Sequence, residues 1–371
     1  MICVRVLKKK WRYVGTGRQD GLKIRCEQSR ESSSLSGATI WFFSMNYNIQ
    51  YLRAIAAIAT VAFHVIVTSY NYGYDYPNFF NVEQWGKYGV DLFFVISGYI
   101  IVYIQDKSNK NISLFLKNRF LRIIPTYYFL TTFYISLLVF FPNLIKWSSN
   151  FELNSTILES YLFYSTWFEN FPIVYVGWSI EYEIYFYLIF SISILLKDLI
   201  KEYYLTLIII IILFLIFDLQ LFVLEFCLGI VIFIITKKYK INKNISLLLF
   251  LSGIIIFVID IKKLEELDRF FRYGIPSFLI ILGSINLKEY KFSFFRLLGD
   301  ASYSIYLIQV FTISFVFKIL SFFSFKGYDF LFFSVNVIFT IIIGLIFYII
   351  FEKKILKFKN SNTTQTQKLG V

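Results

Sequence analysis

The stretch Asn48–Tyr70, NIQYLRAIAAIATVAFHVIVTSY, is apolar over enough residues to cross a lipid bilayer. It nevertheless carries Arg53 and His64, the single histidine of the chain. Helical geometry places these two side chains within roughly 20° of one face and about 16 Å apart along the axis. Ionisable groups inside a span are costly and usually mark a pathway or a reaction, whereas a lone histidine on an apolar helix is more often a packing residue. Both interpretations stay open at this point.

The apolar character extends over most of the chain. Of its 371 residues, 57% are hydrophobic, 21% aromatic and 16% charged, and the mean hydropathy is +0.64. Several apolar runs exceed the roughly eighteen residues that a span needs, and a soluble core could not hold such runs without aggregating. We therefore predict an all-α polytopic membrane protein with about ten transmembrane helices, at approximately 49–70, 89–105, 123–141, 175–196, 203–218, 220–236, 245–260, 271–287, 299–320 and 330–351.

Loop charges predict the orientation of these spans. Basic side chains dominate the loops after the second and sixth spans and the C-terminal end, whereas acidic side chains dominate the opposite loops. Because positive loops stay on the cytoplasmic side, both termini are expected in the cytoplasm, and the protein is expected to be a multi-pass protein of the inner (cytoplasmic) membrane. The net charge of +13 follows from these loops and from the N-terminal segment, and no nucleic-acid partner is expected.

Three regions differ in composition. Residues 1–44 are polar and Ser-rich, with nine basic and three acidic side chains. Met45 directly precedes the first span, so we expect translation to start there and 1–44 to be a non-native extension; a disordered cytoplasmic arm is the alternative. Residues 45–355 form the predicted membrane domain, and 356–371 a polar cytoplasmic tail.

Neither a disulfide framework nor a metal site is suggested by the cysteines. Cys3 and Cys26 lie in the N-terminal segment and Cys227 lies in a predicted span. With one histidine and no cysteine cluster, zinc chemistry is very unfavourable, and no metal is expected.

Polar residues gather at the outer ends of the predicted spans. Asp91 begins the second span at about the expected depth of His64, where a carboxylate could hold an imidazole as a general base; alternatively, Asp91 only caps its helix. Glu181 and Glu183 lie in the fourth span on different faces, which requires a cavity or partner for each. Ser97, deeper in the second span, could be a nucleophile, but nothing nearby in sequence activates it.

Basic residues gather at the inner end of the third span. Arg119 and Arg122 share one helix face, with Lys117 adjacent. Such a cluster commonly anchors a helix to anionic lipid head groups. Alternatively, it forms a phosphate-binding mouth, because arginine forks suit phosphates.

Five blocks resemble acyltransferase family 3, membrane-bound enzymes that O-acylate sugars. The family's Arg and His, separated by ten residues, match Arg53 and His64 in YLRAIAAIATVAFHV. GVDLFFVISGY and RFLRIIP are similar to its second and Arg-x-x-Arg motifs, and GWSIEYEIYFYLIF to a block that places its glutamate at Glu183. LGDASYSIYLIQ resembles a fifth block, in which Gln309 stands where a histidine is common. The resemblance covers nearly all of 45–355.

The resemblance implies an integral membrane O-acyltransferase, in particular an O-acetyltransferase. It would move an acyl group from cytoplasmic acetyl-CoA or another acyl-CoA to a hydroxyl of a surface polysaccharide or glycan precursor. The implied partners are the acyl-CoA, the saccharide acceptor and the bilayer. His64 would be the base or a transient acyl carrier. The catalytic candidates are His64, Asp91 and Glu183, and the donor-binding candidates are Arg53, Arg119, Arg122 and Ser97.

Two alternatives compete with this function. A non-enzymatic transporter or flippase for a lipid-linked glycan would share the spans and the intramembrane charges, but it would not need one irreplaceable histidine. A proton-coupled carrier is disfavoured, because no chain of ionisable residues crosses the full thickness of the predicted membrane domain.

Overall fold

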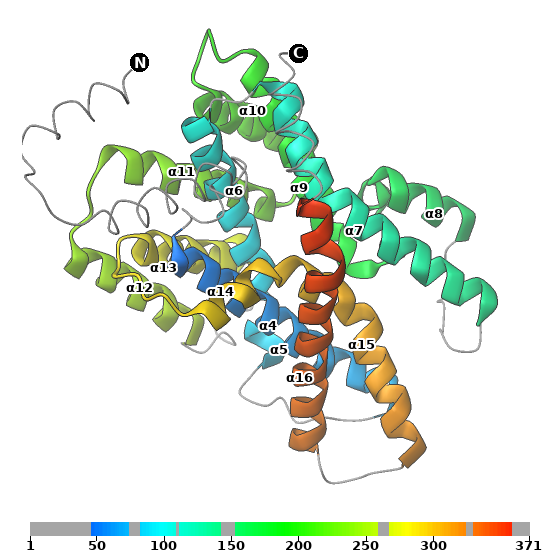
Figure 1. Ribbon diagram of the computed structural model, residues 1–371. Coiled ribbons are helices and arrows are strands. Elements are labelled where there is room, and N and C mark those ends of the chain that lie inside the picture. The colour runs from blue at the N-terminus through cyan, green and yellow to red at the C-terminus, as the bar shows by residue number, and fades with distance from the viewer. Residues whose placement is uncertain are drawn as a thin grey trace, which may run out of the picture. The chain divides into compact units, whose positions relative to one another are not determined.

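The computed structural model describes residues 46–73, 82–108, 111–141, 153–258, 267–323 and 329–357 (Figure 1). Within these ranges the chain forms helices and no strand, which confirms the predicted all-α class. The predicted extension, 1–44, and most of the predicted tail, 356–371, lie outside the described residues.

Five of the described helices are long and apolar enough to cross a membrane. They are α4 (Tyr47–Asn71), α6 (Tyr88–Ser108), α7 (Ile112–Phe140), α15 (Ser302–Phe323), whose candidate span is 302–320, and α16 (Asp329–Phe347), which continues through the π-helical turn η8 (Tyr348–Glu352). The protein is therefore a multi-pass membrane protein. The other spans of the predicted ten, and the side on which the termini lie, stay predictions.

The remaining helices fall where the other apolar segments were predicted. They are α9 (Trp178–Leu195), α10 (Glu202–Phe217), α11 (Glu225–Lys238), α12 (Lys243–Val258) and α13 (Ile275–Ile285), the last preceded by the π-helical turn η7 (Phe270–Gly274). Short helices connect them: α5 (Val82–Trp85), α8 (Leu153–Leu162), α14 (Ser293–Asp300), and the 3₁₀ turns η3 (Ser165–Phe168), η4 (Tyr175–Gly177) and η5 (Leu221–Leu224).

Helix α4 contacts α5, α6, α14, α15 and α16, and α15 and α16 run side by side (Figure 1). It begins at the Asn46 side chain, which accepts a hydrogen bond from the Asn48 amide. Five of its fourteen buried residues are alanines, which let neighbouring helices approach its backbone closely. The buried alanines are Ala54, Ala56, Ala57, Ala59 and Ala62.

Helix α6 lies between α4 and α11, and glycines fix both contacts. An added Cβ at Gly89 would lie 2.3 Å from the Ala56 carbonyl oxygen on α4. On the other side, a Cβ at Gly98 would lie 2.2 Å from the Phe226 carbonyl oxygen on α11. The rotation of α6 is therefore set by backbone contacts, and this rotation turns Ser97 toward the cavity described below.

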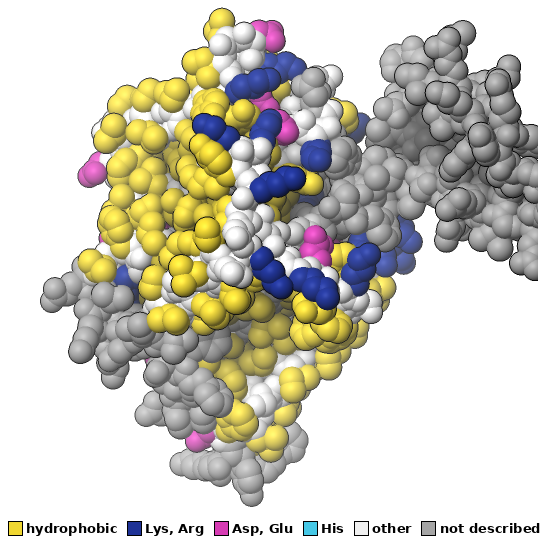
Figure 2. Space-filling view, turned by 90° about the vertical axis from the view of Figure 1, so that its left-hand side faces the viewer, with side chains coloured by type: hydrophobic (Ala, Val, Ile, Leu, Met, Phe, Trp, Pro, Cys, Tyr) yellow, Lys and Arg dark blue, Asp and Glu magenta, His cyan; other side chains and the backbone are white. Residues whose placement is uncertain are grey.

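Apolar side chains cover the outside of several helices. On α10, α12 and α16 many of the large aliphatic residues are exposed, as expected of surfaces that face lipid. Figure 2 shows lysine and arginine gathered in one region of the face it draws, with hydrophobic side chains over much of the rest. Examples of the exposed residues are Leu215, Ile216, Leu248, Ile255, Ile338 and Ile342.

Helix α7 begins eleven residues before its predicted span. The Asn111 side chain caps it by accepting a hydrogen bond from the Leu114 amide, so Pro125 lies inside the helix. The prediction placed the boundary at 123 because the basic residues before it were assigned to a loop. In the structure, Arg119 and Arg122 belong to the helix and reach the protein interior, where Arg119 is buried.

Candidate active site

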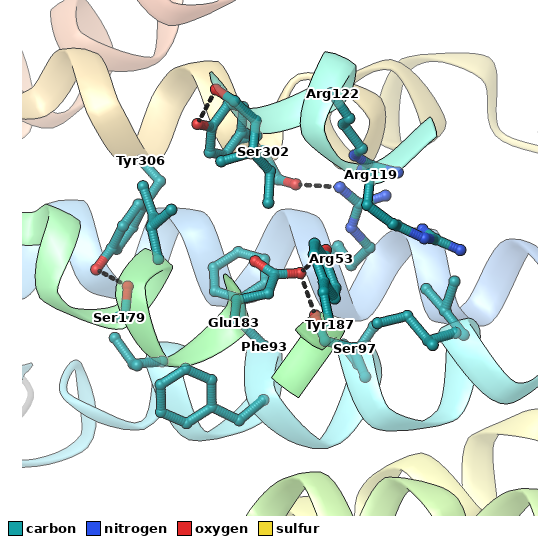
Figure 3. Close-up of a pocket in the computed structure, with 18 residues that line it drawn as sticks. Arg53, Phe93, Ser97, Arg119, Arg122, Ser179, Glu183, Tyr187, Ser302 and Tyr306 are labelled. Carbon is teal, nitrogen blue, oxygen red and sulfur yellow. Dashed lines mark hydrogen bonds between the residues drawn. The ribbon is translucent and has the colours of Figure 1, made fainter. Parts of the chain in front are cut away.

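A cavity lies among α4, α6, α7, α9 and α15, with an empty volume of about 760 Å³ that includes space open to the surroundings. Figure 3 shows three arginines at one end, Glu183 in the middle, and Ser179 with Tyr306 at the other end. Five of the seven predicted site residues line this cavity: Arg53, Ser97, Arg119, Arg122 and Glu183.

The arginines reach the cavity from two helices that are distant in sequence. Arg53 on α4 donates to the Ser302 hydroxyl at 2.9 Å and to the Gln50 side-chain oxygen at 3.2 Å. The Arg119 guanidinium lies 5.8 Å from the centre of the Tyr187 ring, a cation–π contact. Arg122 joins them from the next turn of α7. Together they present a concentrated positive charge suited to an anionic ligand.

Glu183 brings a carboxylate to the middle of this cavity. Its Oε1 accepts hydrogen bonds from the Ser97 hydroxyl, at 2.9 Å, and from the Tyr187 hydroxyl. Arg53 and Arg119 both lie within electrostatic range of it. No hydrogen bond to Oε2 is formed among the described residues, so this oxygen can accept one from a ligand.

At the opposite end of the cavity, hydroxyl groups hold the turn η4. The Tyr306 hydroxyl donates to the Val176 carbonyl oxygen at 2.9 Å and lies 2.8 Å from the Ser179 hydroxyl. In the same turn, the Tyr175 ring packs edge-to-face against the His64 ring, with centroids 5.2 Å apart. Turn η4 thus connects the cavity with His64.

His64 itself is half-buried and does not line the cavity. Its ring contacts the rings of Phe63 and Tyr175. Neither ring nitrogen forms a hydrogen bond or ion pair with any of the described residues. Its orientation among those residues is therefore set by aromatic packing.

The expected pairing of Asp91 with His64 is wrong. The Asp91 carboxylate is fully buried and accepts bonds from Nε and Nη2 of Arg269, at 2.8 and 3.1 Å. The same guanidinium lies 5.2 Å from the ring centres of Trp178 and Phe222. Asp91 is thus one half of a bidentate ion pair that ties α6 to the segment before η7.

The physical reason for this error is the depth of Asp91. Gly89 packs on Ala56 and Thr60, eight and four residues before His64, so the start of α6 lies about 6–12 Å from His64 along the axis of α4. The expectation assumed that the second span begins level with His64. Instead α5, which packs on α4, comes first in the chain, and α6 begins deeper.

Glu181 has a structural partner rather than a place in the cavity. Its buried carboxylate accepts bonds from the Ser165 amide at 3.3 Å and from the amide and hydroxyl of Thr166, both at 2.9 Å. These groups begin η3, whose first amides need acceptors. Glu181 and Glu183, two residues apart on α9, therefore have different roles, as we predicted from their positions on different faces of the helix.

Several residues of this region were not predicted from the sequence. Arg269 lay in no quoted motif, and Tyr187, Ser302 and Tyr306 were quoted only as part of larger blocks. Gln309 is fully buried and donates to the Tyr306 carbonyl oxygen at 2.7 Å. A possible signal was the concentration of hydroxyl side chains at 302–306 in an apolar span.

No group of three His, Cys, Asp or Glu side chains within the described ranges is arranged to hold a metal ion. The groups available to a ligand are the arginines, the Glu183 carboxylate and the hydroxyls. This set suits an anionic organic molecule better than a metal.

Comparisons with known proteins point to one family. Residues 46–351 match a family model described as an acyltransferase domain. The exopolysaccharide production protein ExoZ of Rhizobium meliloti is 29% identical over 258 residues, 63% of this chain and 78% of the relative. The peptidoglycan O-acetyltransferase OatA of Listeria monocytogenes is 33% identical over 161 residues, 38% of this chain and 23% of the relative. No solved structure matches.

Proposed function

Because the chain belongs to acyltransferase family 3, we propose that it is a membrane O-acetyltransferase whose acceptor is a hydroxyl of a cell-surface polysaccharide or its precursor. The donor we propose is acetyl-CoA or another acyl-CoA that enters from the cytoplasm. We propose that the protein lies in the inner (cytoplasmic) membrane. The names of the relatives support a polysaccharide acceptor, since one produces an exopolysaccharide and the other O-acetylates peptidoglycan.

The observation that carries this proposal is the cavity with arginines at one end and hydroxyls at the other. Arginine forks bind phosphates, so Arg53, Arg119 and Arg122 are proposed to hold the phosphates of CoA. Arg53 and His64 are about 16 Å apart along α4, a distance that the flexible arm of CoA can bridge. The thioester would then lie at the end near η4, next to His64.

His64 is proposed to take the proton of the acceptor hydroxyl. A neutral imidazole is suited to this at neutral pH. Ser97 and Glu183 lie along the path of the arm, and the open Oε2 of Glu183 can accept a bond from an amide of the arm. Asp91 is not proposed as a catalytic group, because its carboxylate is engaged by Arg269.

The test of this proposal measures the release of free CoA from acetyl-CoA by purified protein. Wild-type protein should release CoA, and His64→Ala should lower the rate about 100- to 10,000-fold, as for loss of a general base. A transporter of lipid-linked glycan would release none. Unchanged release by His64→Ala would contradict the role of the histidine.

The donor site is tested separately with Arg119→Gln/Arg122→Gln. Loss of two charge-assisted phosphate contacts costs about 3–5 kcal/mol at most, so the KM for acetyl-CoA should rise sharply while the insertion of the protein is unchanged. Lys238→Gln, an exposed basic residue outside the cavity, is the matched control and should behave as wild type. Unchanged KM with impaired insertion would instead support the lipid-anchor interpretation of these arginines.

A further inference from the structure

Turn η4 is held from two sides by side chains of other helices. The Tyr306 hydroxyl on α15 donates to the Val176 carbonyl oxygen. From α7, the fully buried Tyr127 ring packs under Gly177, where an added Cβ would lie 2.7 Å from a ring carbon. The Ser179 hydroxyl also donates to the Val176 carbonyl oxygen, at 3.2 Å, so η4 is fixed by two hydrogen bonds and one steric contact.

Of these contacts, the hydrogen bond from Tyr306 to Val176 is the one that borders the cavity. Tyr306 and Ser179 both line it, and their hydroxyls are 2.8 Å apart. Both hydroxyls also lie at donor distance from the Val176 carbonyl oxygen, 2.9 Å for Tyr306 and 3.2 Å for Ser179, so the three groups form one hydrogen-bonded network. Gln309 fixes the backbone of the same turn of α15 by donating to the Tyr306 carbonyl oxygen. All these groups are buried, so their bonds do not exchange readily with water.

Turn η4 also contains Tyr175, whose ring contacts His64. Among the described residues, His64 forms no hydrogen bond that would fix its ring, which leaves the rings of Tyr175 and Phe63 to set its angle. Phe63 is the neighbour of His64 in α4 and moves with it. Tyr175 is therefore the contact that relates the angle of the His64 ring to the rest of the protein.

We propose that Tyr306 is a positioning residue for His64, acting through η4 and Tyr175. Its hydroxyl holds Val176, which fixes Tyr175, which in turn orients the imidazole toward the end of the cavity where Ser179 and Tyr306 lie. This inference deepens the proposed function and rests on it for its catalytic meaning, but the structural part can be measured without activity.

The single histidine makes that measurement direct. Protein labelled with ¹⁵N-histidine and purified through a histidine-free tag gives NMR signals from His64 alone. In Tyr306→Phe, which loses the hydroxyl and keeps the ring, the His64 signals should shift or broaden. Tyr51→Phe is the matched control: the Tyr51 hydroxyl also donates to a backbone carbonyl, that of Tyr290, and Tyr51 lies near the start of α4, thirteen residues before His64. Its spectrum should match wild type.

Activity provides the second readout. Tyr306→Phe should lower kcat for acyl transfer about tenfold or more, with KM for acetyl-CoA unchanged, because the arginines are untouched. Tyr175→Phe, which keeps the ring on His64, should retain activity, whereas Tyr175→Ala should resemble Tyr306→Phe in both readouts. If Tyr306→Phe leaves the His64 signals and kcat as in wild type, the positioning role is overturned. A shifted signal in a protein that never consumes acetyl-CoA would support the positioning and contradict the proposed function alone.

Discussion

The ion pair of Asp91 and Arg269 is expected to stabilise the fold without acting on the histidine. Asp91→Asn would leave a largely buried guanidinium without its counter-charge. We expect a loss of about 3 kcal/mol, the lower end for a broken buried pair, because the Arg269 side chain is still 30% exposed. Thermal unfolding in detergent measures this loss.

The activity of the same variant separates two roles of Asp91. If it only ties α6 to the segment before η7, the pH dependence of acyl transfer by folded Asp91→Asn should match wild type. The replacement of both partners by apolar residues, Asp91→Leu/Arg269→Met, should cost less stability than Asp91→Asn alone. A shifted pH profile of acyl transfer in Asp91→Asn would instead indicate that Asp91 acts on His64.

Glu181 and Glu183 form a matched pair for substitution. Glu181→Gln weakens the bonds to the amides of Ser165 and Thr166, and we expect it to lower stability by about 2 kcal/mol with activity retained in the folded fraction. Glu183→Gln should do the reverse, with little change in stability and a strong fall in acyl transfer. Thermal unfolding and CoA release are measured for both variants. If both variants lose the same property, stability or activity, the two glutamates do not have separate roles.

At the scale of elements, the contact of α6 with α11 depends on glycine. Gly98→Ala would place a methyl group 2.2 Å from a backbone oxygen, and Gly229→Ala does the same from the other side. Overpacking of this kind costs about 1–3 kcal/mol, and it would also displace Ser97. Gly73→Asn is the control, since nothing lies within 4 Å and asparagine accepts its positive φ of 75°. Thermal unfolding should rank both alanine variants below the control.

Most helices of this fold were predictable because apolar length is a strong signal in a membrane chain. Each predicted segment contains a helix. The boundaries were harder, since α7 begins in a basic stretch that hydropathy assigns to a loop. The short helix α5 was missed as well. Without α5, the second span was expected to begin level with His64. This wrong start led to the wrong pairing of Asp91 with His64.

The site was predictable where motif residues face one cavity, as Arg53, Arg119, Arg122, Ser97 and Glu183 do. It was not predictable where a role depends on contacts between segments distant in sequence. The partner of Asp91 lies 178 positions away, and the residue holding Val176 lies 130 positions away. A single sequence does not show which residues so far apart along the chain are in contact.

For the whole molecule, loop charge predicts that the acidic and basic loops lie on opposite sides of the membrane. In a chain whose three cysteines are replaced by serine, Glu169→Cys should react with an impermeant maleimide on intact cells. Lys240→Cys should react only after the cells are opened. Both positions are exposed, so burial does not explain a difference. Labelling of Lys240→Cys from outside would reverse the topology, and with it the proposed side of the donor.

The π-helical turn η7 has a consequence for how relatives of this protein can differ. A π-helical turn is an α-helix that has gained one residue. Deletion of a residue from Phe270–Gly274 would restore regular helix but rotate everything before it by about 100° relative to α13. Arg269, which directly precedes this turn, would then point away from Asp91. We therefore expect the insertion and the ion pair to be inherited together: a homologue with a one-residue gap at this point should also lack the arginine, the aspartate or both.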